Sequence, residues 1–533
     1  MSELRLVPAA VMVWAVTLAL LIDAPVLPLL ILPLLLRWWR HSGQALLTAV
    51  LGCVAAGLTV WRQQRAAGWS PPAEVVGRVV SSGTGHVRVS VPGHPTPLTI
   101  FSEDDPATGT RVLVEATWSE STRAGVATLT GAGDLTTLTG PQGMGHVAAL
   151  VRDSLRAAVD STVGESSRGL IPGMVLGDVG AQSQTDQQLY IATGLSHLSA
   201  VSGANVAIVT SFAVICCRLL TLGPRVQVAA ATAALLGFVG LVGTEPSVLR
   251  ASATGLVGLL AVLGSSRLEP IHGLSLAVIG LIVWDSDLAV SYGFALSVAA
   301  TAGIIALHPL LFRPLARTRL PEILVRALAV AIAADIVTLP IIALMAGEVS
   351  LVSVLANVLV APAVAPVTVL GLLAAGLSLL PGPLAWLPLK ILEPCTWWIH
   401  TVATWCASLP MSTVPAEPVW VLIAYGWILA GIVANRPRLT LTVLLTWWLW
   451  NADLSRPAPE IPLESLNVHV VADIEAVDRA PPGTQVIVVR DPTGRPATRP
   501  TVTRDGVPVL FPDRDGEVTL HTDGTQHARD GRF

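Results

Sequence analysis

The chain has 533 residues, of which 52% are hydrophobic and only 13% are charged, and its mean hydropathy is +0.66. This composition is too apolar for a soluble globular enzyme and is typical of a polytopic membrane protein. The net charge of −4 excludes a global basic field of the kind that attracts nucleic acid, so a polyanion would have to be bound by local charges.

The N-terminal region, residues 1–66, is predicted to form transmembrane helices. An almost unbroken apolar stretch over 6–36 is too long for the core of a cleavable signal peptide and favours a tight helical hairpin. The next apolar run, 45–60, is predicted to cross the membrane again. Arg62 and Arg65 at its far end weaken that prediction, because positive residues favour the cytoplasmic side.

Residues 70–138 change to short alternating runs separated by Gly, Pro and Ser, which predicts a small β-barrel. The expected strands are 74–80, 86–91, 97–101, 111–118 and 125–130. Val87, Val89 and Val91 alternate with polar residues and should share one face. Seven acidic residues against four arginines are the wrong balance for binding phosphates. The aromatic residues Phe101 and Trp118 are expected to fill the barrel.

Two short segments follow the β-domain. Residues 143–163 have an amphipathic pattern and are predicted to form a helix on the membrane surface. Residues 169–177 are apolar but only about half a membrane span long. A segment of this length is expected to re-enter the bilayer without crossing it.

The region 168–451 contains ten predicted crossings, so that the whole chain is expected to have about 11–13 transmembrane helices. They lie near 189–215, 226–243, 247–264, 271–285, 288–308, 325–345, 350–380, 384–408, 418–434 and 438–451. The segment 350–380 contains two prolines and forms either one broken helix or a hairpin. The arginines between crossings fall on one side, which the positive-inside rule makes cytoplasmic and which places the β-domain and the tail outside.

The stretch 193–206 lies where a membrane helix is expected, yet it is rich in small and polar residues. One side of such a helix would carry a stripe of small residues that favours close helix packing, namely Ser196, Ala200, Gly203 and Ala207. His197 is ionisable near neutral pH. Residues 202–205 are expected to loosen the helix, and irregular polar backbone at membrane depth usually lines a cavity. The stretch is therefore either an ordinary packing seam or part of a transport path.

Residues 194–209, preceded by the pair Gly177-Asp178, resemble the competence domain of the ComEC family of bacterial DNA-uptake membrane proteins. Further blocks of the family follow in the same order, at 246–251, at 292–297, and at 349–357 with Pro362. The resemblance covers roughly 170–370. It implies a polytopic channel that carries single-stranded DNA across the cytoplasmic membrane, and it makes the β-domain an OB-like extracytoplasmic domain.

Polar residues within the predicted spans are the candidates for a transport path: Asp178, His197, Ser202, Gly203, Asn205, Arg250, Asp335 and Asn357. A central carboxylate such as Asp335 costs about 2.5–3.5 kcal/mol in lipid, so it should face protein or water. Arg250 either faces a pore or snorkels to the nearby outer surface, and Asn357 is typical of an interhelical hydrogen bond. We predict that His197, Asn205 and Arg250 converge on a hydrated path, with Asp178 near its outer mouth.

The tail, residues 452–533, is polar and rich in Pro and Gly, and is predicted to be a small β-domain or partly disordered. Many ComEC-like chains end in a metallo-β-lactamase-like domain, whose chemistry requires an HxHxDH cluster. Here His469, His521 and His527 are isolated from one another. We therefore expect no catalytic metal, no cofactor and no nuclease activity.

The sequence contains no P-loop, GxSxG elbow, HExxH motif or carboxylate dyad on a shared surface, so active transport would need a gradient or an energy-supplying ATPase as a partner. The leading hypothesis is a DNA channel component in the cytoplasmic membrane. The alternative is a secondary transporter of a small solute or lipid, with a proton relay through His197 and Asp335. An intramembrane enzyme is a third possibility.

Overall fold

The computed structural model divides into two compact units, residues 1–447 and 448–533. Up to the end of helix α17 (Pro437–Asn451), the structure describes residues 5–38, 41–72, 74–83, 85–199, 201–263, 269–318, 320–434 and 436–451. In the tail it describes residues 467–472, 477, 484–491, 496–497, 499–503, 507–516, 518–520, 526–528 and 532.

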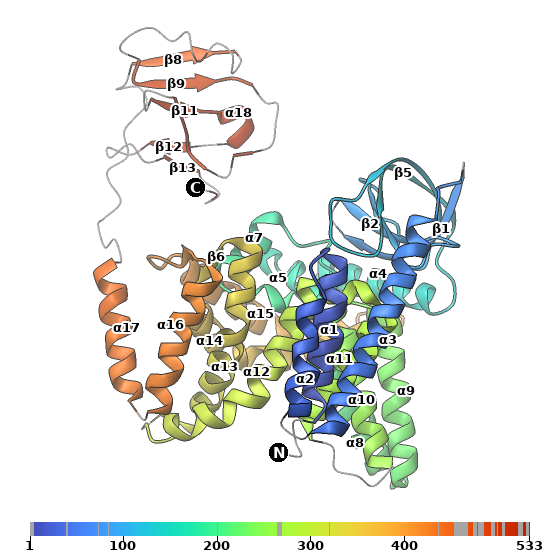
Figure 1. Cartoon of the computed structure of the whole chain (residues 1–533). Helices are drawn as coiled ribbons and strands as arrows, with labels where there is room; N and C mark the ends of the chain where they lie inside the picture. Colours follow the sequence, from blue (N-terminus) through green and yellow to red (C-terminus); the bar gives the residue numbers. More distant parts are fainter. Residues whose placement is uncertain are drawn as a thin grey trace. The chain divides into compact units, whose positions relative to one another are not determined.

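The chain is a polytopic helical membrane protein with an OB-like β-domain (Figure 1). Its larger helices are α1 (Val7–Leu21), α2 (Ile31–Trp38), α3 (Ser42–Ala67), α8 (Gly203–Leu219), α9 (Pro224–Val242), α10 (Pro246–Leu263), α11 (Pro270–Trp284), α12 (Tyr292–Leu315), α13 (Glu322–Ala346), α14 (Ser353–Leu377), α15 (Trp386–Ala407), α16 (Pro418–Val433) and α17 (Pro437–Asn451). Among the described residues, five helices are long and apolar enough to cross a membrane, namely α3, α9, α12, α13 and α14. Six apolar helices are shorter.

The N-terminal helices form the predicted hairpin. Helix α1 ends at Leu21, the chain turns through Asp23 in a left-handed conformation, and a 3₁₀ turn η2 (Leu27–Leu30) leads into α2. Both α1 and α2 pack against α3. Helix α3 extends beyond the predicted run, and Arg62 near its end donates hydrogen bonds to carbonyl oxygens of Val283 and Trp284. These are unpaired carbonyls at the end of α11, which explains an arginine at this position.

The β-domain is a closed barrel, as predicted. Its strands are β1 (Val75–Gly83), β2 (His86–Ser90), β3 (Leu98–Phe101), β4 (Arg111–Glu120) and β5 (Leu129–Thr139), in the order β1-β2-β3-β5-β4 with β3 parallel to β5. A five-stranded barrel of this kind is OB-like. Val87, Val89 and Val91 are buried in its core. The prediction for Phe101 is wrong, because this ring is 41% exposed and the guanidinium of Arg123 stacks over it.

The fifth strand begins later than predicted because residues 121–128 form a loop that anchors the barrel to the helices. Val126 in this loop is fully buried in a cluster with residues of α1 and α11, including Leu274 and Ile282. Its backbone N–H donates a 2.7 Å hydrogen bond to Asp287 Oδ1 in the 3₁₀ turn η4 (Ser286–Val290). The buried side chain of Val126 and the hydrogen bond from its backbone N–H therefore attach the barrel to the helix bundle.

The amphipathic helix is present as α4 (Met144–Thr162), but protein covers much of its apolar face. Val151, Leu155 and Val159 are buried in a cluster that includes Val175 and Leu389, from two other helices. Leu150 and Val147 remain exposed. Thus α4 packs onto the helix bundle as well as presenting apolar side chains outward.

The predicted single helix over 189–215 is wrong. The chain forms α7 (Gln184–Ala192), a 3₁₀ turn η3 (Ser196–Leu198) and, after an extended residue at Ser202, helix α8 from Gly203. Ser196 and Gly203 consequently do not share a helix, so the proposed stripe of small residues is not formed. The predicted loosening near 202–205 is confirmed by the break before α8.

The segment 350–380 is a single helix, α14, with Pro362 and Pro366 inside it, and not a hairpin. A short strand β6 (Glu348–Ser350) precedes it and pairs with β7 (Thr413–Pro415). This pairing holds the buried segment before α14 in place.

In the tail, a sheet of four strands in the order β10-β11-β9-β8 and a separate two-stranded sheet form a small β-unit. The strands are β8 (Val468–Val471), β9 (Val486–Val489), β10 (Thr501–Val502), β11 (Pro508–Leu510), β12 (Val518–Leu520) and β13 (Gln526–Ala528). Ile487, Val489 and Val509 are at the core of the first sheet. The short helix α18 (Pro512–Asp515) carries a buried carboxylate, Asp515, paired with Arg514. The described tail residues thus form a small β-unit with its own apolar core.

The arginines between helices lie at one end of the bundle. The connections α8–α9, α12–α13 and α16–α17 are opposite the barrel in Figure 1. The described arginines in or beside these connections are Arg218, Arg225, Arg313, Arg317, Arg326 and Arg436; Arg267 and Arg319 are outside the described residues. This arrangement is the one that the positive-inside rule requires for a barrel outside the cytoplasm.

We expect the barrel and the tail to be extracytoplasmic. Reporter enzymes active only in the cytoplasm should therefore be inactive when fused at Thr108 or Gly506, and active when fused between α12 and α13. Cytoplasmic reporter activity at Thr108 would contradict the assignment of sides that follows from the arginines.

Candidate functional site

The candidate site is built around a buried half-helix, α6 (Leu170–Leu176), whose seven residues are all buried. The helix ends at Gly177, which has a φ of +72° and so adopts the left-handed conformation that glycine allows. A Cβ placed on Gly177 would lie 3.4 Å from a methyl carbon of Val201 and 3.6 Å from Glu245 Oε1. The turn after α6 is therefore packed between the segment before α8 and the start of α10.

Asn205 joins this half-helix to two long helices. Its side chain is buried, and Nδ2 donates a 2.8 Å hydrogen bond to the carbonyl oxygen of Met174 in the last turn of α6. Its Oδ1 accepts from the hydroxyls of Ser202 and Thr368, each at 3.3 Å. The amide thus satisfies a carbonyl that the end of α6 leaves unpaired, and connects α6, α8 and α14.

Arg250, in the second turn of α10, is only 9% exposed. Its Nε donates a 2.7 Å hydrogen bond to the hydroxyl of Ser297 on α12. A Cβ placed on Gly203 would lie 3.3 Å from Nη2 of Arg250, so the first residue of α8 closely approaches the guanidinium. No carboxylate forms an ion pair with Arg250 in the part of the chain that the structure describes. A buried cation therefore lies beside the positive end of a helix dipole.

Asp178, directly after Gly177, pairs with an arginine of α4. Both of its carboxylate oxygens accept hydrogen bonds of 2.7 Å from Arg156 Nη2, and Oδ1 also accepts from the backbone of Gly180. One turn earlier on α4, Arg152 Nη2 donates to the carbonyl oxygen of Val242 at the end of α9. The prediction places Asp178 at an outer mouth, and the structure places it beside α4, which follows the barrel directly.

A second carboxylate, Glu245, lies near Arg152 in the connection between α9 and α10. Burial raises the pKa of the Glu245 carboxyl, and the neighbouring Arg152 guanidinium offsets part of this shift. Glu245 therefore takes up a proton more readily than an ordinary glutamate. A protonated Glu245 carboxyl no longer offsets the positive charge of Arg152.

His197 lies apart from the other predicted residues of the path. It is exposed on η3. No hydrogen bond or ion pair among the described residues connects it to Asn205 or Arg250. The structure therefore brings Asn205 and Arg250 together around the first turn of α8, but it does not bring His197 into contact with them.

Asp335 and Asn357 belong to a neighbouring polar cluster. Asp335 is buried on α13 and accepts a hydrogen bond from the hydroxyl of Ser353, the first residue of α14. Asn357 Nδ2 donates to the carbonyl oxygen of Ser353 at 2.9 Å and, more weakly, to that of Gly194 at 3.5 Å. Asp335 therefore faces protein, as its position predicts, and the cluster connects α13, α14 and the turn after α7.

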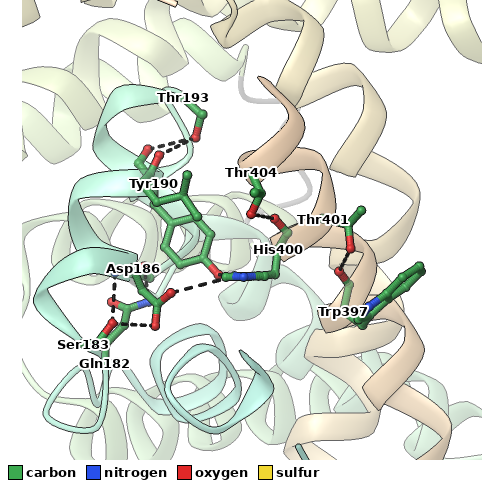
Figure 2. Close-up of polar contacts among 11 residues, drawn as sticks. Gln182, Ser183, Asp186, Tyr190, Thr193, Trp397, His400, Thr401 and Thr404 are labelled. Carbon is green, nitrogen blue, oxygen red and sulfur yellow. Dashed lines mark hydrogen bonds and ion pairs between the residues drawn. The ribbon is translucent and has the colours of Figure 1, made fainter. Parts of the chain in front are cut away.

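A third polar cluster was not predicted from the sequence. Figure 2 shows Asp186 and Tyr190 of α7 facing His400 of α15. The Nδ1 atom of His400 lies 3.5 Å from the Tyr190 hydroxyl and 3.8 Å from Asp186 Oδ1. The Ser183 hydroxyl caps α7 by accepting from the Asp186 backbone N–H. The Ser-x-x-Asp spacing was the available signal for this helix start, but nothing local indicated that the distant His400 would meet it.

Two further groups of charged residues lie near the site. Lys390 and Glu393 form the local ion pair that their spacing predicts, at 3.0 Å, and Glu393 also accepts from the backbone of Gly164. Arg152 and Arg156 lie on the polar face of the amphipathic helix α4. Their contacts with the ends of α6 and α9 make them part of the site.

Residues 174–438 match the model of a protein family described as Competence protein. The matched range begins within α6, and all eight of the predicted transport residues lie inside it. No curated protein and no solved structure matches the chain.

Proposed function

Because the chain belongs to the competence protein family over residues 174–438, we propose that it is a channel component that carries single-stranded DNA across the cytoplasmic membrane. Family membership supports a role in DNA uptake. The finer proposal, of a strand passing between the helices of this domain, rests on the chemistry around Arg250.

The buried guanidinium of Arg250 is the observation that carries the proposal. Removing a charged group from water costs several kcal/mol unless a partner compensates it. Within the described residues its hydrogen-bonding partner is the neutral hydroxyl of Ser297, and Gly203, the first residue of α8, closely approaches the guanidinium. Both features favour an anion at this position. A phosphodiester supplies the missing negative charge, and an arginine fork fits its two oxygens.

In this proposal, the contacts around α6 and α8 close the path between rounds of transport. Asn205 holds α8 to α6, and the hydroxyl of Ser247 donates a 2.9 Å hydrogen bond to the carbonyl oxygen of Val201. A nucleic acid strand cannot pass while these segments are in contact. Transport therefore requires α6 or the segment before α8 to move away from α10, and the short, broken elements of this region are suited to such a movement.

Transport energy and strand processing are assigned to partners in this proposal. We propose that an ATPase or a gradient supplies the energy. We also propose that the chain itself is not a nuclease, because His469 and His527 lie on strands of two different sheets in the tail. In the described part of the chain, no group of three or more His, Cys, Asp or Glu residues is arranged to hold a metal ion.

We expect the purified full-length protein to leave both single-stranded and double-stranded DNA intact in the presence of Zn²⁺ or Mn²⁺, because catalytic metal sites need several converging ligands. Incubation with labelled DNA, followed by gel electrophoresis, measures this, with a metal-dependent nuclease as the positive control. Cleavage that EDTA abolishes would show that ligands converge from positions that the sequence keeps apart.

The proposed function is tested by deleting the gene in a transformable host and restoring it. Labelled duplex DNA should accumulate outside the cytoplasmic membrane in the deletion strain, and single-stranded label should reach the cytoplasm only after complementation. Normal entry of label in the deletion strain, with defective uptake of a small solute or lipid instead, would support the alternative transporter.

A further inference from the structure

Two arginines on α4 form a cationic pair at the barrel side of the site. Arg152 and Arg156 are one helical turn apart, so their side chains lie on the same face of α4. They reach the ends of two other elements, the turn after α6 and the last turn of α9. The α8–α9 connection is opposite the barrel in Figure 1, so Val242 at the other end of α9, and with it this pair, lies on the barrel side.

The hydrogen-bonding capacity of both arginines is only partly used. Both bonds from Arg156 to Asp178 come from the single atom Nη2. The Nε atoms of Arg152 and Arg156 are buried and have no hydrogen-bond partner among the described residues. Since an unmade hydrogen bond of a buried charged donor is costly, each guanidinium retains the capacity for a further acceptor if it turns outward.

The contact between Asp178 and Arg156 can exchange. The Arg156 side chain is 43% exposed, whereas that of Asp178 is 12% exposed. An ion pair with one partner this exposed is stabilised only weakly, because water screens it. Asp178 presents two oxygens to Arg156, which is also the arrangement that a phosphodiester presents. The carboxylate is therefore a suitable occupant of the position until a phosphate replaces it.

The arginine pair is continuous with the position of Arg250. Gly177, next to Asp178, approaches Val201 and Glu245, and Ser247 bonds to Val201 three residues before Arg250 on α10. Consecutive contacts thus lead from α4 to the buried guanidinium. A DNA strand that follows these contacts would pass from the arginines of α4 to Arg250.

We infer that Arg152 and Arg156 form a phosphodiester-binding site at the outer mouth, and that the Asp178 carboxylate occupies this site until DNA displaces it. The inference rests on the proposed function, because it assigns the strand's first contact with the helical domain. It makes Asp178 a competitor of the ligand, so that removing its charge improves binding.

The test measures binding of a fluorescent oligothymidylate to the full-length protein in lipid nanodiscs, by anisotropy, at salt concentrations from about 50 to 200 mM. Arg156→Gln should weaken binding about tenfold, as expected for a lost charge-assisted hydrogen bond. It should also reduce the slope of log K against log salt by about 0.7, as expected when one phosphate contact to a single strand is lost. Asp178→Asn should bind more tightly than the wild type.

The matched control is the exposed ion pair between Arg326 and Glu322, at the opposite end of the bundle. Arg326→Gln and Glu322→Gln remove the same charges and should leave oligothymidylate binding unchanged. A variant that merely misfolds cannot reproduce the expected gain of Asp178→Asn. If Asp178→Asn does not bind more tightly, or if Arg156→Gln behaves like Arg326→Gln, the site is overturned while the proposed function stands. If the wild type itself does not bind and the protein is dispensable for uptake, the proposed function fails, and this site with it.

Discussion

In a transformable host, Arg250→Ala is expected to abolish DNA uptake while the protein remains in the membrane at its normal abundance. The loss of uptake follows from removing the buried cation that faces the start of α8, where the proposed path offers few other donors deep in the protein. We expect unchanged abundance because an unpaired buried charge contributes little to stability. Its removal costs only the packing contacts of the side chain. Transformation frequency and immunoblots of membranes measure the two quantities.

Two companion variants separate charge from packing at this position. Arg250→Lys retains the charge without the planar fork and should recover part of the uptake. Ser297→Ala removes the neutral partner of Nε, and it should reduce uptake only modestly because the charge remains. If Arg250→Ala lowers membrane abundance in proportion to uptake, or if Arg250→Lys is as defective as alanine, the guanidinium has a packing role and the anion-binding role is wrong.

The elements that depend on local pattern were predictable. The alternation of Val87, Val89 and Val91 with polar residues marks a half-buried strand, and the structure buries all three. Long apolar runs indicated the helices, and the polar and small residues at 202–205 indicated a break that is present before α8. In each case the relevant information lies within a few residues of the element, which is why the sequence alone is sufficient.

Contacts between distant segments were not predictable in the same way. The pairing of Arg156 with Asp178 depends on how α4 crosses the end of α6, and the meeting of Asp186 with His400 joins residues that are far apart along the chain. Periodicity shows which face of a helix is apolar, but not which partner covers it. The exposed position of Phe101 is a related case, because it depends on where β3 ends in the closed barrel.

Gly194→Ala is expected to reduce the amount of folded protein, because the native geometry of Gly194 does not accommodate a Cβ. Gly194 follows α7 with a φ of +70°, a conformation that costs an alanine about 1–2 kcal/mol. An added Cβ would also lie 2.5 Å from Cβ and 3.2 Å from Cα of Ser353. Ser353 is buried and bonded to Asp335, so it has little freedom to move, and overpacking of this kind typically costs a further 1–3 kcal/mol, or roughly 2–5 kcal/mol in total.

Gly347 provides the matched control for this prediction. It has nearly the same conformation, with a φ of +74° at the end of α13, but an added Cβ there would meet no atom within 4 Å. Gly347→Ala should therefore lose only the conformational cost of about 1–2 kcal/mol, whereas Gly194→Ala should lose the steric contribution as well. The midpoint of thermal unfolding in detergent, together with membrane abundance, should fall clearly further for Gly194→Ala. Equal effects of the two substitutions would mean that α14 can shift away from the turn after α7. The cluster of Asp335, Ser353 and Asn357 would then not hold that turn rigidly beside the path.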